Sequence, residues 1–127
     1  MSEIYQESLV EIEIVPAPYD LLAGGSYFSV DEIRLSSGEY RRGEILVKSG
    51  DVFVKGTVST LASADEVCIM AKKAVIPEGS EGIDAGYFSG NFNRGHLWLN
   101  GDLLAFYQEE EIASVKALLR KHYIFVR

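Results

Sequence analysis

Apolar and polar residues alternate over the first part of the chain, from Glu3 to Val15. One face of this pattern carries Ile4, Val10, Ile12 and Ile14, and the other carries Glu3, Glu7, Glu11 and Glu13. A period of two predicts an amphipathic β-strand, because successive side chains of a strand point to opposite faces. Pro16 and Pro18 follow, and proline has no N–H to donate to a β-ladder, so the strand is expected to end there. We therefore predict an extended N-terminal arm over residues 1–18, hinged at the prolines, and a single domain over residues 19–127.

Short apolar segments separated by turn residues predict further strands. Residues 67–70 form a continuous apolar run between charged pairs, which suits a strand buried on both faces. The other predicted strands follow the turn at Tyr40 as far as Lys48, and cover residues 52–58 and 87–92. Residues 21–29 predict a turn into a short apolar segment, residues 36–38 a turn and residues 78–86 a loop. Gly90 interrupts the last of these strands, which indicates a bulge or a close backbone approach.

One helix is expected, over about residues 108–121. A stripe at helical spacing is formed by Ile112, Val115, Leu119 and His122. Acidic residues 109–111 occupy the first turn, and Arg120 and Lys121 occupy the last, so each sign of charge lies where the helix dipole favours it. A short strand at residues 123–126 closes the chain. Many short strands and one late helix predict a mixed α+β architecture.

Composition narrows the class of protein. A chain of 127 residues has room for one domain, and 47% hydrophobic with 24% charged residues is ordinary for a globular protein. No apolar run approaches the roughly 18 residues of a membrane span. The opening residues, Met1 to Ile4, lack the basic and apolar regions of a signal peptide. We therefore expect neither secretion nor membrane insertion.

The net charge of −7 is concentrated at the beginning of the sequence. Residues 1–33 contain seven of the 19 acidic residues and none of the 12 basic residues, so the remainder is neutral. This balance disfavours binding to nucleic acid phosphates or to anionic lipid. The acidic third is either a solvated segment or one that meets a basic partner surface.

Few residues suggest catalytic or metal chemistry. Cys68 lies in an apolar run and is interpreted as a buried hydrophobe instead of a reactive thiol. His96 and His122 are far apart and form no metal-ligand pair. The acidic residues 109–111 point in different directions on a helix, so they cannot converge on one ion. Arg41 and Arg42 stand without a wider basic stripe and are interpreted as surface turn residues. We expect no cofactor, no metal and no enzymatic activity.

Much of the aromatic content lies within a dozen residues. The members of this group are Tyr87, Phe88, Phe92 and Trp98. Aromatic groups bury a large area in either a core or an interface. The core is the simpler interpretation, and a subunit interface is the alternative.

From these aromatic residues onward, the sequence resembles the lambda-type bacteriophage head decoration proteins. The shared order is an aromatic residue before Ser89-Gly90, a one-residue spacer, Phe92, then Leu97-Trp98, a charged helix, and a short strand at residues 124–126. The resemblance covers roughly residues 67–127. In the lambda protein a proline follows the tryptophan, whereas Leu99 follows it here.

The resemblance implies a small structural protein of the virion. It implies a mixed α+β fold, mainly short antiparallel strands in a small β-tulip-like barrel with one C-terminal helix and an extended N-terminal arm. It also implies a homotrimer on the outer surface of an expanded capsid, made in the host cytoplasm and bound to the major capsid protein of a tailed phage. The arm residues expected to pair with that protein by β-augmentation are Ile4, Tyr5, Leu9, Val10, Ile12 and Ile14.

A second interpretation comes from a different class of protein. A small β-barrel carrier or ligand-binding domain displays a lysine on a hairpin for a covalent cofactor. Lys48, which precedes Ser49-Gly50, is the candidate for such a lysine.

Overall fold

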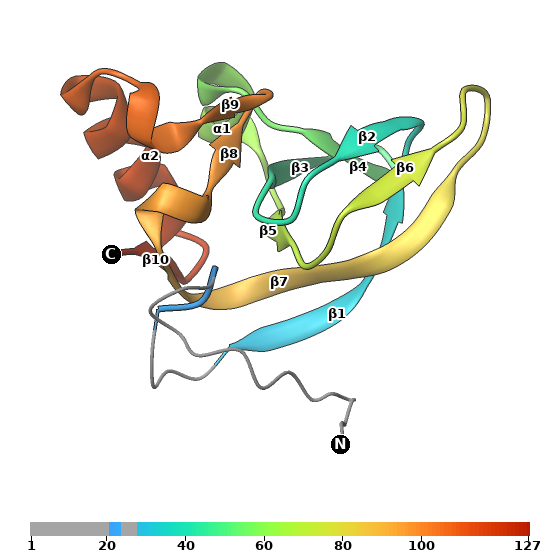
Figure 1. Cartoon of the computed structure of the whole chain (residues 1–127), viewed down its shortest axis with the longest axis horizontal. Coiled ribbons are helices and arrows are strands. Elements are labelled where there is room, and N and C mark those ends of the chain that lie inside the picture. Colours follow the sequence, from blue (N-terminus) through green and yellow to red (C-terminus); the bar gives the residue numbers. More distant parts are fainter. Residues whose placement is uncertain (1–20, 24–27) are drawn as a thin grey trace.

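The fold is that of a computed structural model, and the structure describes residues 21–23 and 28–127 (Figure 1). The predicted arm at residues 1–18 lies outside the described residues, as does part of the predicted turn at residues 21–29. The described part of the chain is a mixed α+β, strand-rich domain with two α-helices.

Ten strands and two α-helices follow one another along the described chain. The first strands are β1 (Ser29–Leu35), β2 (Gly38–Tyr40), β3 (Ile45–Ser49) and β4 (Val52–Lys55). After helix α1 (Val58–Ser63) come β5 (Val67–Met70), β6 (Ala74–Ile76) and β7 (Gly82–Phe92). The last elements are the 3-10 helix η2 (Arg94–His96), β8 (Trp98–Leu99), β9 (Asp102–Leu103), the 3-10 helix η3 (Leu104–Phe106), α2 (Glu109–Arg120) and β10 (Ile124–Val126).

Six strands form one sheet in the order β1-β4-β3-β5-β7-β10, and β1 also pairs with β7. The order of pairing from β1 through β4, β3, β5 and β7 therefore returns to β1. Contact between β1 and β4 is a single parallel pair, Leu35 with Phe53, whereas β1 and β7 pair along the whole of β1. Two smaller ladders, β2–β6 and β8–β9, complete the strands.

The long strand β7 corrects the predicted loop at residues 78–86. That prediction is wrong from Gly82 onward, because β1 satisfies the main chain of Gly82 to Gly86 by antiparallel pairing. Gly86 is required there by packing, since a Cβ atom at this position would lie 2.8 Å from the sulfur of Cys68. The same pairing corrects the start of the domain, where β1 was not predicted.

Helix α1 was also not predicted. The sequence suggested a strand over residues 52–58, but β4 ends at Lys55 and α1 begins at Val58. Thr57 caps the helix: its hydroxyl accepts the N–H of Thr60, and the Thr60 hydroxyl accepts the N–H of Thr57. This reciprocal cap starts a helix at Val58, although the β-branched residues on either side favour a strand.

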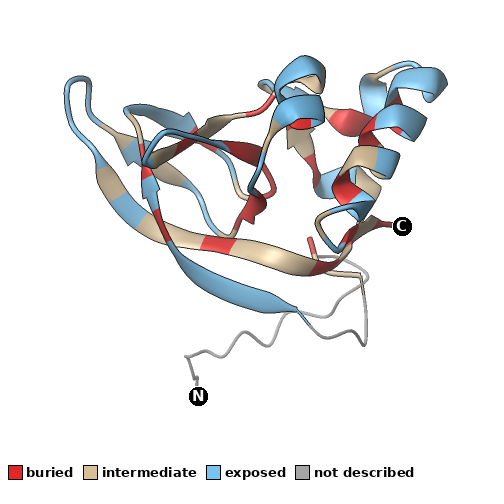
Figure 2. Cartoon of the chain, turned by 180° about the vertical axis from the view of Figure 1, so that it is seen from behind, coloured by how far each residue is buried: buried red, intermediate tan, exposed pale blue. Residues whose placement is uncertain are grey.

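Helix α2 confirms the predicted C-terminal helix to within one residue at each end. Its stripe of Ile112, Val115 and Leu119 is buried, as Figure 2 shows in red on the inward side of the helix. At its start, the carboxylate of Glu111 accepts the N–H of Gln108. The predicted closing strand is confirmed as β10.

Two hydrophobic clusters lie on opposite faces of β3 and β5. Ile45 and Val47 of β3 belong to the larger cluster, which also contains the buried stripe of α2, and Leu46 belongs to the smaller one. In β5, Val67 and Ile69 face the larger cluster while Cys68 and Met70 face the smaller. The predicted strand at residues 67–70, buried on both faces, is confirmed.

Two glycines with positive φ provide a test of the turns. Gly43 (φ +93) has no room for a Cβ atom, which would overlap the carbonyl oxygen of His96, whereas Gly50 (φ +65) faces open space. We expect Gly50→Ala to lower the free energy of unfolding by about 1–2 kcal/mol, the cost of the left-handed backbone. Gly43→Ala should cost roughly 3 kcal/mol or more, because overlap is added to that strain. Urea unfolding of both variants measures the difference, and equal costs would contradict the close packing at Gly43.

Candidate binding face

The outer edge of β1 has an open stretch of main chain. In β7, the carbonyl of Ala85 accepts the N–H of Ala71, on the side of β5. The N–H and C=O groups of one strand residue point to the same side, so those of Ala85 face β5 and do not bond to Glu32, its partner in β1. The N–H and C=O groups of Glu32 therefore point away from β7. Ser36 lies four residues after Glu32, so its main chain points to the same side, and its N–H donates to the carbonyl oxygen of Phe53 in β4 at 3.3 Å. Val30 and Glu32 lie beyond this single contact with β4, so their edge pairs with no described strand, and the N–H of Glu32 instead donates to the carboxylate of Asp31 at 2.7 Å.

Exposed apolar and acidic side chains surround this edge. Val30 is 48% exposed and Ile83, which belongs to β7, is 64% exposed. Figure 2 shows the exposure of β1 as a pale blue band over most of its length. A shallow groove of about 480 Å³ runs along these residues and includes Asp31 and Glu32. We call this surface, formed by Val30, Asp31, Glu32 and Ile83, the β1 edge.

One end of the β1 edge lies at a β-bulge of β7, at Phe88. The register places Ser29 against Ser89 but Val30 against Tyr87, so one residue of β7 is unpaired. Gly90 follows with φ +141, and a Cβ atom on it would lie 2.9 Å from the Cβ atom of Phe28. The predicted close backbone approach at Gly90 is thus confirmed.

The six arm residues predicted to bind a capsid protein lie outside the described residues. They are Ile4, Tyr5, Leu9, Val10, Ile12 and Ile14. The β1 edge was not predicted from the sequence. The alternation of charged Glu32 and Arg34 with apolar Ile33 and Leu35 could have indicated a strand. Which of its edges is open depends on the strand with which it pairs, and the sequence does not give that partner.

The four predicted aromatic residues do not form one cluster. Tyr87 and Phe92 lie together in the larger hydrophobic cluster, with ring centroids 5.7 Å apart, and Phe28 packs edge-on against Tyr87 at 5.3 Å. Phe88 points to the opposite face of β7 and meets Phe53 at 5.8 Å. Of the four, only Phe92 is fully buried.

Trp98 lies apart from the other three, in β8, where it pairs with Leu103 of β9. The guanidinium of Arg41 stacks over its ring, 4.2 Å from the centroid, and also donates to the carbonyl oxygen of Gly101 at 3.3 Å. Such a cation–π contact stabilises by roughly 0.5–1 kcal/mol at an exposed site. Arg41 thus ties the turn after β2 to the β8–β9 turn.

Glu44 is a fully buried carboxylate beneath this contact, and sequence analysis missed it. One carboxylate oxygen accepts the N–H of Arg41 at 3.3 Å, and the other accepts the N–H of Gly101 at 3.2 Å. Its main chain bonds to Met70 and pairs with Trp98. An acidic residue directly before the apolar run of β3 was the available signal. Its contacts indicate a role in holding two turns together.

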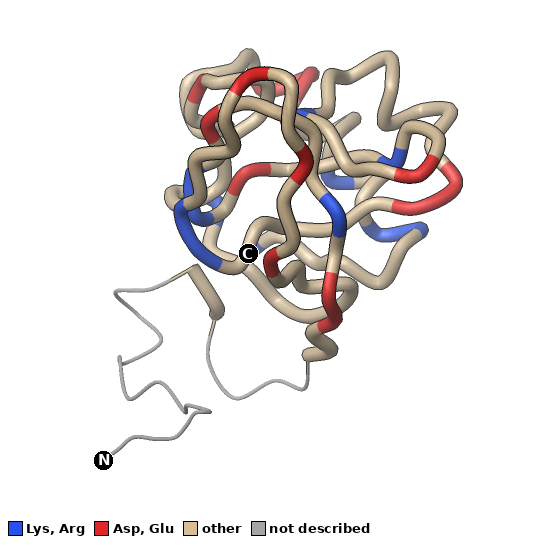
Figure 3. The backbone as a smooth tube through the Cα atoms, turned by 90° about the vertical axis from the view of Figure 1, so that its right-hand side faces the viewer, with Lys and Arg blue, Asp and Glu red and all other residues tan. Residues whose placement is uncertain are grey.

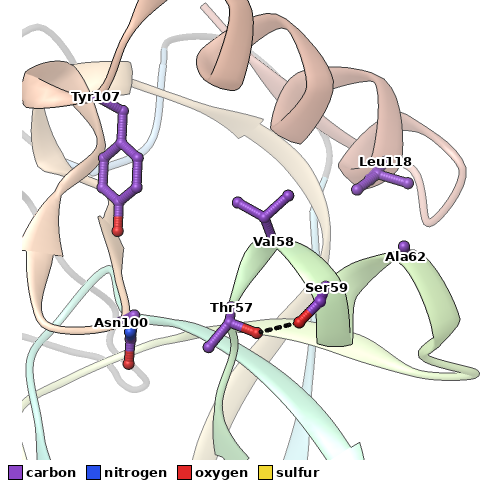
Figure 4. A pocket seen from close by; sticks show the side chains of 7 residues that line it. All are labelled: Thr57, Val58, Ser59, Ala62, Asn100, Tyr107 and Leu118. Carbon is purple, nitrogen blue, oxygen red and sulfur yellow. Dashed lines mark hydrogen bonds between the residues drawn. The ribbon is translucent and has the colours of Figure 1, made fainter.

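A second hollow lies between the helices (Figure 4). It measures about 530 Å³ and is lined largely by apolar groups from α1, α2 and the ring of Tyr107. The Tyr107 hydroxyl donates to the carbonyl oxygen of Leu99 at 2.7 Å. Partial burial, then the negative charges of Asp102, Glu111 and Glu44, raise the pKa of this phenol.

Lys48, the candidate carrier lysine, lies on the β3–β4 hairpin. Ser49 pairs with Val52 across the two-residue turn at Gly50 and Asp51, as the sequence predicted. The Lys48 ammonium is 3.3 Å from a carboxylate oxygen of Glu66, and its side chain is 38% exposed. It therefore lies beside the turn and is held by an ion pair.

Positions of Lys and Arg and of Asp and Glu are both spread along the described backbone (Figure 3). Within the described ranges, no group of three or more His, Cys, Asp or Glu side chains is placed to hold a metal ion. None of the helices described is long and apolar enough to span a membrane.

The role of Glu44 that its contacts indicate is tested by substitution. Glu44→Ala leaves the N–H groups of Arg41 and Gly101 without their acceptor, so we expect a loss of about 2–4 kcal/mol in the free energy of unfolding. Glu44→Gln keeps one acceptor oxygen and should cost less. Amide hydrogen exchange at Gly101 should accelerate in Glu44→Ala. The control Glu39→Ala removes an exposed carboxylate of β2 and should change stability by less than about 0.5 kcal/mol; similar losses at both positions would contradict the role of Glu44.

Cys68, predicted as a buried hydrophobe, is fully buried. Burial, with a smaller effect of the Glu66 charge, raises its pKa far above that of an ordinary thiol. The folded protein should therefore resist thiol reagents at pH 8, and the urea-unfolded protein should react fully. Above about pH 9 the thiol ionises only in the unfolded chain, so its contribution to stability is lost as the pH rises. Cys68→Ala should weaken this alkaline decline; rapid labelling of the folded protein would contradict the burial.

Comparison with known proteins found no family model that matches the chain and no curated protein that matches it.

Proposed function

We propose that this protein is a bacteriophage head decoration protein, a non-enzymatic trimer that binds the outside of the expanded capsid and stabilises it against internal DNA pressure. The observation that carries the proposal, beside the sequence resemblance, is the β1 edge. An unpaired strand edge with exposed apolar side chains accepts a further strand by main-chain hydrogen bonds. Its proposed partner is the major capsid protein of a tailed phage.

Some of the residues that carry the resemblance lie close together in the fold, whereas Trp98 lies apart from them. Gly90, Asn91 and Phe92 of β7 pair in parallel with Ile124, Phe125 and Val126 of β10. Phe92 is buried between them and the stripe of α2. This part of the motif therefore forms one packed unit of β7, β10 and α2.

The closed order of pairing supports a finer proposal about the fold. We take the five strands β1, β4, β3, β5 and β7 to be the small β-tulip-like barrel of the decoration proteins, with residues 1–18 as the capsid-binding arm. In this proposal both the arm and the β1 edge contact the capsid.

The proposed mechanism is mechanical. Three copies engage neighbouring capsid subunits together, so weak single contacts hold strongly through effective concentration. A protein that binds only the expanded lattice stabilises that state by mass action. The protein is made in the host cytoplasm and joins the virion after the head has expanded.

Co-sedimentation of the purified protein with compact and expanded heads of its phage tests the proposal. We expect binding to expanded heads alone; equal binding to both forms, or none, would overturn it. Val30→Lys should weaken this binding, because it places a charge on the apolar part of the β1 edge. Val75→Lys is the matched control, since Val75 is also an exposed valine (60%) but belongs to the separate β2–β6 ladder. An equal effect of both substitutions would exclude the β1 edge as the contact.

The carrier interpretation makes a different prediction about Lys48. A carrier domain would bear a covalent group on this lysine when isolated from its natural source. We expect the intact mass to equal that of the unmodified polypeptide. An adduct mapped to Lys48 by peptide analysis would favour the carrier function over the decoration function.

A further inference from the structure

A groove of about 240 Å³ lies at the helical end of the domain, between α2 and η2. Its lining includes Ala113 and Ala117 of α2, one turn apart and both exposed, and the buried Ile112. Small side chains at this spacing leave a channel along the helix surface, because residues four apart lie on the same helix face. The channel can receive individual side chains of a segment that lies across it.

The walls of this groove are basic. Arg94 of η2 and Lys116 and Arg120 of α2 line it, with Glu109 as the single acidic residue. Arg94 and Glu109 are 4.0 Å apart and both substantially exposed, so their ion pair is weak. Lys116 and Arg120 form no ion pair with a described carboxylate. The groove thus carries an excess of positive charge in a protein of net charge −7.

The acidic start of the chain is attached beside this groove. The carbonyl oxygen of Leu21 accepts the N–H of Asn93 at 2.7 Å, and Arg94 is the next residue. The N–H of Arg94 in turn donates to the carbonyl oxygen of Arg127 at 3.2 Å, which adds another basic residue to the neighbourhood. The chain that precedes Leu21 is therefore attached next to Arg94.

We propose that in the free protein the basic groove between η2 and α2 binds the acidic segment of the same chain, residues 3–13, so that binding of this segment to any other partner requires its release from the groove. This segment has four glutamates and no basic residue. The seven residues from 14 to 20 span at most about 25 Å when extended, and α2 is about 18 Å long, so the tether is sufficient. The individual ion pairs are weak, but the tether raises their effective concentration to the millimolar range. The inference does not rest on the proposed decoration function.

A spin label on the acidic segment tests this contact in the full-length protein. Ser8→Cys provides one reactive thiol there, because the native Cys68 is buried. A nitroxide at position 8 should broaden the amide NMR signals of Ala113 and Ala117. The broadening should be strong at roughly 10 mM salt, where the Debye length is about 30 Å, and should be lost at about 1 M, where it is about 3 Å.

Charge-reversal variants identify the residues responsible. In the labelled protein, Lys116→Glu with Arg120→Glu should abolish the broadening at low salt, whereas Lys55→Glu with Lys73→Glu, which makes the same change in net charge elsewhere, should preserve it. Glu11→Lys with Glu13→Lys should restore the broadening in the first of these variants, which excludes a failure to fold as its cause. Broadening that persists in Lys116→Glu with Arg120→Glu, or that is absent from the parent protein at low salt, would overturn the proposal.

An experiment with mixed isotope labels distinguishes binding within one chain from binding to a second copy. Spin-labelled protein without ¹⁵N is mixed with ¹⁵N-labelled protein that carries no spin label. Intramolecular docking predicts no broadening of Ala113 and Ala117 in this mixture. Broadening there would show that the segment binds a second copy, and would overturn the assignment to the same chain.

Discussion

The whole described domain depends on the pairing of β7 with its neighbours. Along its 11 residues β7 pairs with β1 and β5 in antiparallel fashion and with β10 in parallel. Tyr87 and Phe92 place its aromatic side chains in the larger hydrophobic cluster, while Phe88 turns toward the smaller one. Because this one strand contributes to both clusters and pairs with β1, β5 and β10, loss of its pairing would separate the helical end from the rest of the sheet.

The surfaces with a proposed role lie where this frame leaves polar or main-chain groups available. The β1 edge is acidic and partly apolar, and its open main chain follows from the single contact between β1 and β4. The groove at α2 is basic and lies beside the residues that follow the acidic segment. The opposite charges of these surfaces suit them to different partners, which is why the acidic segment is assigned to the α2 groove and not to the β1 edge.

The candidate site was predictable from the sequence only in part. The charge count showed where the acidic segment lies, and Phe92 belongs to the packed unit of β7 and β10. The β1 edge and the burial of Glu44 were not predictable. Glu32 resembles any exposed strand residue until its partner Ala85 is known, and Glu44 is buried only because the N–H groups of Arg41 and Gly101, 60 residues apart in sequence, converge on it.

The sequence by itself determined the elements whose signals are local. The stripe of α2, the apolar run of β5 and the turn at Gly50 each depend on residues within a few positions of one another, so periodicity and turn chemistry were sufficient. Only the tertiary structure decided the length of β7, the existence of β1 and the start of α1 at Val58. Gly82 to Gly86 and the charged residues of β1 have weak preferences of their own, and each becomes a strand because the other satisfies its main-chain hydrogen bonds.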